Sequence, residues 1–254
     1  MTTPRTHSHA RTSLLIACGC LLAAELSHAA AWTSGHGDIG IAYEDEGSGS
    51  ELHLHLHLGE ESPAIINGST IVADEEFEAG DLNININNPS VVPGTATPAF
   101  LAGVGTTIGS TIYSLPASES VAGTAGVPFL GFGTEELDPV NWPTGLTLTL
   151  NSVSGPGDFS LYRFDDPGFT FFMSTADGID GSDALPLTAD NHEHFNLAFT
   201  EAGIYEVTFT ASGTHLTDGL VSSTETFTFA IPEPSTGLLS GLAGLLALAR
   251  RRRA

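Results

Sequence analysis

Polar and apolar residues alternate through most of residues 32–231, and Gly, Pro, Asn and Asp interrupt the alternation about every ten residues. The stretch ELHLHLHLG, residues 51–59, shows the pattern most clearly. Alternation with period two is typical of strands that bury one face, and closely spaced turns are typical of antiparallel sheets. The pattern therefore predicts an all-β domain built as an antiparallel β-sandwich.

Individual segments refine this prediction. AIINGSTIV predicts a hairpin closed by Asn67-Gly68, and LTLTLNSVSGPGDFSLYRF predicts two strands that pair across Gly155-Pro156-Gly157. Tyr205 begins the alternating run YEVTFTA, where a tyrosine corner would lie, so an immunoglobulin-like C-terminal half is expected. No segment shows a convincing helical period, and the strand order within residues 89–133 is not predicted.

Residues 1–31 have the features of a signal peptide. Two arginines precede the apolar run SLLIACGCLLAA, and small residues follow in LSHAAAW. We expect signal peptidase to cleave between Ala30 and Trp32; lipoprotein processing before Cys18 or Cys20 is the alternative, with little apolar sequence upstream. These are the only cysteines, so the mature protein is expected to have no disulfide and no thiolate ligand.

The C-terminal residues 232–254 have three parts in a fixed order, namely Pro232, Glu233 and Pro234, an apolar stretch, and Arg250, Arg251, Arg252 and Arg253. The apolar stretch would form a helix of about 20 Å, shorter than the roughly 30 Å hydrocarbon core, so we expect a short transmembrane helix that holds the protein transiently in the inner membrane. The segment resembles the PEP-CTERM sorting signal of Gram-negative bacteria. That resemblance implies cleavage by an exosortase and delivery to the cell surface or extracellular matrix.

The charge of the intervening domain narrows the possible partners. It holds 28 of the 30 acidic residues and one of the seven basic residues, Arg163, which gives a formal charge of −27. Such a charge excludes nucleic acid and anionic lipid as partners and favours cations. The acidity also fits simple solubility outside the cell.

Histidine is concentrated in alternating positions. Of seven histidines in the domain, six lie in three short motifs, which are His53-x-His55-x-His57, His192-x-His194 and His36-x-Asp38. Residues two apart on a strand point to the same face about 6.6 Å apart, so two imidazoles can converge on one cation. These residues predict a site for Zn²⁺ or another divalent transition metal, although polar residues on a wet strand face remain the alternative.

The strand 51–59 cannot supply all of its histidines to one ion, because its outer two lie about 13 Å apart. We therefore expect one adjacent pair from this strand to join His192 and His194, with His36 and Asp38 in auxiliary roles. Asp38 would be a ligand or a carboxylate that orients one.

A calcium site is less favoured. STADGIDGSDAL spaces Asp177, Asp180 and Asp183 three residues apart but lacks the order of a Ca²⁺-binding loop. Aspartates are also ordinary turn formers.

Several motifs together resemble the surface-anchored domain known as choice-of-anchor M. They are WTSGHGDIGIAYEDEG, LHLHLHL, GVPFLGFGTEEL, LTLTLNSVSGPGDFSLYRF and HEHFNLAFTEAGIYEVTFTASG. Leu197 stands where the family pattern has tryptophan, whereas the His192 and His194 pair is intact. The resemblance implies a surface receptor or relay that hands a metal to the substrate-binding protein of an uptake system.

No enzyme is expected, because the chain lacks the G-x-S-x-G, H-E-x-x-H and phosphate-loop motifs. Two functions stay open. The first is a metal-binding surface module; the second is a structural or adhesive protein of the biofilm matrix, which contacts matrix polysaccharide and has no specific ligand.

Overall fold

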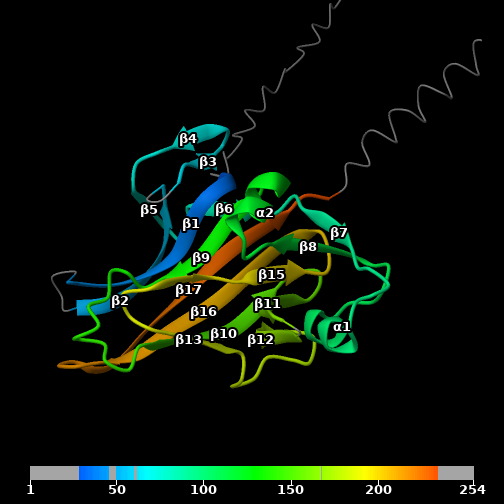
Figure 1. The fold of residues 1–254 in the computed structure, drawn as a ribbon. Coiled ribbons are helices and arrows are strands. Elements are labelled where there is room, and N and C mark those ends of the chain that lie inside the picture. The colour runs from blue at the N-terminus through cyan, green and yellow to red at the C-terminus, as the bar shows by residue number, and fades with distance from the viewer. Residues whose placement is uncertain (1–28, 46–49, 60–61, 167, 234–254) are drawn as a thin grey trace, which may run out of the picture.

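The computed structural model describes residues 29–45, 50–59, 62–166 and 168–233. Residues 1–28 of the predicted signal peptide and the whole predicted membrane helix lie outside these residues. Strands dominate the described part, which confirms the all-β class (Figure 1).

The longest strands belong to a sheet that we call the long sheet. Its order is β13 (Ala184–Leu187), β10 (Leu146–Ser154), β16 (Gly203–His215), β17 (Gly219–Ile231), β6 (Leu82–Asn85), β1 (Ala30–Asp45), β3 (Ala64–Ile66) and β4 (Ser69–Ile71). Only the first residues of β1 belong to the long sheet, where they pair with β6 and β3.

The rest of β1 pairs with other strands and forms what we call the histidine sheet. Its order is β14 (His192–His194), β9 (Pro128–Gly133), β1, β2 (Ser50–Leu58) and β5 (Glu75–Glu78). The change of partners follows a register shift between Trp32 and Ser34 and a positive φ of 89° at Gly35. A side chain at Gly35 would collide with the Pro63 carbonyl oxygen, 2.0 Å from the Cβ position, so glycine permits this crossing.

A third sheet and two short helices complete the described fold. The sheet order is β12 (Gly168–Ser174), β11 (Phe159–Asp165), β15 (Asn196–Phe199), β8 (Thr111–Leu115) and β7 (Pro89–Val91). The helices are α1 (Pro98–Val104) and α2 (Glu119–Ala125). Both lie in the region 89–133 and were not expected from the sequence, since seven residues are too few to establish a helical period.

The hydrophobic core joins the three sheets. Phe209 of β16 lies edge-on to Phe132 of β9 and to Phe159 of β11, with ring centroids 6.2 and 6.3 Å apart. From β2, all four leucines enter this core, as the alternation predicts, namely Leu52, Leu54, Leu56 and Leu58. The histidines between them therefore point to the other face of the histidine sheet.

Two local predictions are confirmed. The hairpin β3–β4 closes at Asn67 and Gly68, which have φ values of 49° and 77°. The Tyr205 hydroxyl donates to the Glu201 carbonyl oxygen at 3.1 Å and accepts from its N–H at 3.2 Å, the contact of a tyrosine corner. The immunoglobulin-like form of the C-terminal half stays a prediction.

Two other predictions are wrong. The strands β10 and β11 do not pair across the Gly-Pro-Gly segment; β10 pairs with β13 and β16, and β11 with β12 and β15. The segment crosses between sheets over Tyr205, whose ring would lie 2.3 Å from a Cβ at Gly155. The sheets are also not purely antiparallel, because β1 with β6, β1 with β9 and β17 with β6 are parallel pairs.

Candidate metal centre

The pairing register of the histidine sheet brings both histidine motifs onto one face. One row across β14, β9, β1 and β2 consists of His192, Gly133, Gly40 and His55. The next row consists of His194, Gly131, Asp38 and His57. Because paired residues point to the same side of a sheet, histidines from β14 and β2 flank a strip that glycine keeps low.

We call Gly40, Gly131 and Gly133 the glycine strip. A Cβ at Gly131 would lie 1.9 Å from Asp38 Oδ1 and 2.8 Å from His194 Cε1. A Cβ at Gly40 would lie 2.6 Å from His55 Nε2. Because these glycines have no side chains, the neighbouring polar groups can lean over β9 and β1. Glycine is therefore needed at these positions for the close approach of those groups.

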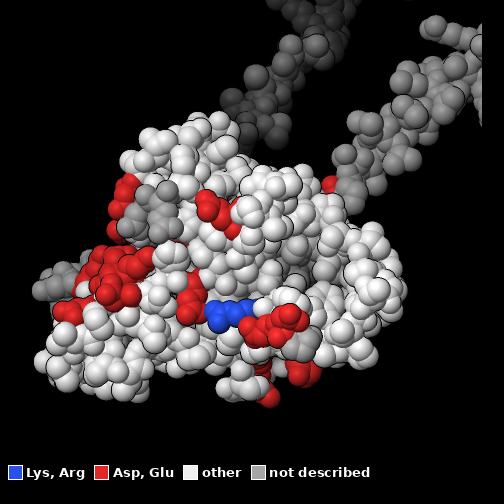
Figure 2. All heavy atoms as spheres, in the orientation of Figure 1, with Lys and Arg blue, Asp and Glu red and all other residues white. Residues whose placement is uncertain are grey.

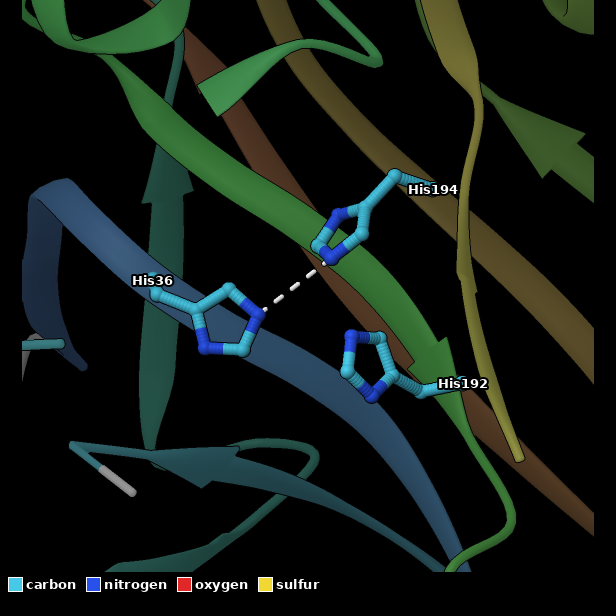
Figure 3. Close-up of side chains that lie close together, drawn as sticks. All are labelled: His36, His192 and His194. Carbon is cyan, nitrogen blue, oxygen red and sulfur yellow. Dashed lines mark hydrogen bonds between the residues drawn. The ribbon is translucent and has the colours of Figure 1, made fainter. Parts of the chain in front are cut away.

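Three imidazoles converge on one side of the strip, and we call them the histidine trio. His36 comes from β1, and His192 and His194 come from β14 (Figure 3). The Nε2 atoms of His36 and His194 are 3.3 Å apart, and one nitrogen from each of the three rings lies within 4.8 Å of the others. His36 is 3% exposed, whereas His192 and His194 are half-buried, so the trio is partly open to the outer surface of the face.

Neighbouring side chains fix the orientation of these rings. Glu135 Oε1 lies 2.5 Å from His192 Nδ1. Asp38 Oδ2 lies 3.6 Å from His36 Nε2. The Phe129 ring stacks on His194 with centroids 3.6 Å apart and an angle of 7° between the planes.

Burial keeps the His194 ring of the trio neutral. It lowers the pKa of His194 to about 4; nearby His36 and His192 lower it further, while the Leu130 backbone acts in the opposite direction. At neutral pH the His194 ring is therefore uncharged and has a nitrogen lone pair to offer, which is the form that binds metal.

The histidines of β2 form a second group with a residue from the loop after β9. His55 Nε2 lies 3.2 Å from Glu136 Oε1, and His57 Nδ1 lies 3.8 Å from the same oxygen. Ligand atoms of these three residues lie within 4.8 Å of one another. The contact with His55 is the largest cause that lowers the pKa of Glu136; burial raises this pKa, and the positive charges that His55, His57 and His53 can carry lower it further.

The prediction of one shared site is wrong. A pair from β2 does not join His192 and His194, because β9 and β1 intervene and separate β14 from β2 by about 14 Å. His36 takes the predicted place of that pair. His53 belongs to neither group and lies 3.7 Å from Glu78.

Three acidic residues near the histidines were missed by the sequence reasoning. Glu135 and Glu136 follow β9 directly, and Asp74, which hydrogen-bonds His57 Nε2, precedes β5. The pair in GTEEL was readable in the sequence, but nothing linked it to histidines far away in the chain.

Two of the three aspartates of the candidate calcium loop, Asp180 and Asp183, have other partners. Asp183 accepts the N–H groups of Ser174 at 2.7 Å and Asp180 at 2.8 Å. Asp180 accepts from Ser182, and this contact lowers its pKa. These hydrogen bonds are those of a turn.

Among the described residues, no helix combines the length and the apolar character that crossing a membrane requires.

The family model described as PEP-CTERM protein-sorting motif matches residues 230–253. No curated protein and no solved structure matches the chain, and the resemblance to choice-of-anchor M therefore has no support from these comparisons. The chain carries a PEP-CTERM sorting signal and is thus an exported protein that exosortase sorts to the surface of a Gram-negative bacterium.

Proposed function

We propose that this exported protein is a surface module that binds a divalent transition metal, zinc foremost, through His36, His192 and His194. The observation that carries the proposal is the 3.3 Å between the Nε2 atoms of His36 and His194. Two nitrogens that bind one tetrahedral zinc at 2.0–2.1 Å are about 3.3–3.4 Å apart. His36 and His194 therefore already have the separation that a shared ion requires, and His192 offers a ring nitrogen within 4.8 Å of them.

The surroundings support the same reading. A carboxylate that accepts from the distal nitrogen of a metal-bound histidine fixes the tautomer of that ring, and Glu135 stands in this relation to His192. The burial that keeps His194 neutral also removes competition from protons. An isolated N–H···N hydrogen bond would explain the His36–His194 contact but not the third ring beside it.

We propose binding rather than catalysis as the role of this centre. Three protein ligands leave a fourth position on zinc for water or for a ligand from another protein. Such an open position suits a receptor or relay that hands the metal to a substrate-binding protein of an uptake system. The alternative is a structural or adhesive matrix protein, which the sorting signal and the acidic surface also fit.

Zinc titration of the purified protein by calorimetry tests the proposal. We expect saturable binding with a Kd in the micromolar range or below for the unaltered chain. His36→Ala with His194→Ala should abolish this tight binding, whereas His53→Ala, on the same sheet face but outside the trio, should not change it. Equal zinc binding by the double variant and the unaltered chain would refute the metal centre and leave the matrix role.

A further inference from the structure

The group formed by His55, His57 and Glu136 has its own arrangement of ligands and supports. Both histidines come from β2, two residues apart, and Glu136 reaches them from the loop that follows β9. Glu136 Oε1 lies between the rings, at 3.2 Å from one ring nitrogen and 3.8 Å from another. Two imidazoles and one carboxylate are a common ligand set for divalent transition metals.

The His55 ring is costly to bury unless it has a ligand. It is 1% exposed, and neither of its ring nitrogens makes a hydrogen bond within the described residues, although Nε2 lies 3.2 Å from Glu136 Oε1. An imidazole carries at least one N–H, and a buried donor without a partner costs about 1–3 kcal/mol. A metal ion at Nε2 would offset such a cost, because coordination is far stronger than a single hydrogen bond.

A carboxylate holds one nitrogen of the His57 ring, as Glu135 does for His192 in the trio. Asp74 hydrogen-bonds its Nε2, so its Nδ1 faces Glu136. The His53 ring stacks on His55, with centroids 5.3 Å apart and 17° between the planes, and covers it from the outer side of the strand. Each ring of the pair is thus held by a neighbour that takes no part in the group.

Acidic residues surround this end of the histidine sheet. A hollow beside His53 is lined mainly by four glutamates, namely Glu44, Glu51, Glu78 and Glu225. Figure 2 shows acidic side chains gathered on the side of the molecule where β2 lies in Figure 1. Such a field raises the local concentration of cations.

We propose that His55, His57 and Glu136 bind a second divalent metal ion, more weakly and with faster exchange than the trio. Its carboxylate ligand is about one-third exposed, whereas the trio uses imidazoles alone. The two sites share one loop, because consecutive residues serve them: Glu135 orients His192, and Glu136 binds the second ion. The proposal extends the proposed function to two ions on one sheet face, an outer ion that exchanges and an inner ion that is retained.

The adjacent glutamates provide a matched test. Glu136→Gln and Glu135→Gln are the same change at neighbouring positions, and each removes one charge with little change of shape. Zinc binding is measured by competition with a chromophoric chelator, and zinc content is measured after equilibrium dialysis at two fixed free-zinc concentrations. Circular dichroism confirms the fold of each variant, and Glu206→Gln, the same change at an exposed position on β16, serves as the control.

We expect two ions for the unaltered protein. Glu136→Gln removes a ligand and should weaken only the second ion, by more than about 100-fold, since loss of an orienting residue alone costs about 10–100-fold. Glu135→Gln should weaken only the first ion, by about 10–100-fold. The Glu206→Gln variant should keep both ions.

The outcomes separate this proposal from the proposed function. One ion in the unaltered protein, insensitive to Glu136→Gln and lost in His36→Ala with His194→Ala, would overturn the second site and leave the trio intact. One ion sensitive only to Glu136→Gln would support the second site and overturn the trio. Two ions that Glu135→Gln and Glu136→Gln weaken equally would also overturn the second site as a separate one.

Discussion

Gly131 is the position where a single methyl group should disturb the candidate metal centre most. Its Cβ would lie 1.9 Å from Asp38 Oδ1 and 2.8 Å from His194 Cε1. Carbon and oxygen atoms in contact are about 3.4 Å apart, so the Asp38 carboxylate must retreat by roughly 1.5 Å in Gly131→Ala. Asp38 is only 6% exposed, and the retreat therefore requires movement of the packed groups around it.

The expected cost is that of overpacking, about 1–3 kcal/mol in the free energy of unfolding. For a domain of this size that corresponds to a fall of about 2–12 °C in Tm. The displaced His194 ring would also lose its separation from His36, so the zinc affinity of the trio should fall. Differential scanning calorimetry and zinc titration measure the two effects.

Gly123→Ala is the matched control. Gly123 lies in α2, and a Cβ there meets no atom within 4 Å. The helix should gain about 0.5–1 kcal/mol from the lost flexibility of glycine, with unchanged zinc binding. If Gly131→Ala kept the Tm and the zinc affinity of the unaltered protein, the glycine strip would have no part in forming the site.

Three further predictions concern the supports of the site. Arg163 donates a hydrogen bond to Glu193 at 2.6 Å and lies 4.7 Å from the Phe195 ring centroid. Arg163→Met should lower the free energy of unfolding in urea by about 1–2 kcal/mol. It should also weaken zinc binding, because Glu193 separates the two histidines of β14. Tyr205→Phe should cost about 0.5–1.5 kcal/mol and leave the zinc Kd unchanged, since the lost hydrogen bonds lie at Glu201. Burial lowers the pKa of His194 from 6.5 to about 4. Below pH 6.5 the unfolded chain therefore binds a proton at His194 that the folded chain does not bind. The metal-free protein should thus lose stability as the pH falls from 6.5 to 4. The urea midpoint of His194→Gln should decline less over this pH range than that of the unaltered protein. Equal declines in the two proteins would contradict the lowered pKa of His194.

The alternation in β2 shows how far sequence reasoning reaches. It predicted that four leucines enter the core and that three histidines share the other face, and both statements hold. The neighbouring strand β1 pairs with β2 in an antiparallel hairpin, as is common for strands that follow each other along the chain. The alternation gave no means to foresee that His55 is buried and His53 is not, since burial depends on what covers the strand.

The pairing of strands that lie far apart in the chain could not be predicted from the sequence. The site depends on β9 lying parallel to β1 and on β14 lying antiparallel to β9. No local signal encodes these pairings, because many strands of this chain have similar patterns and any of them could pair. The roles of Glu135, Glu136 and Asp74 were missed for the same reason.

The sequence by itself determined the all-β class, the sorting signal, the excess of negative charge and the alternating histidine motifs, because these follow from composition, local periodicity and short motifs. The tertiary structure alone decided which ligands meet. It placed His36 with His192 and His194, and it placed His55 and His57 with Glu136. The physical reason is that glycine on β9 and β1 lets side chains lean across the sheet only after long-range pairing has set those strands side by side.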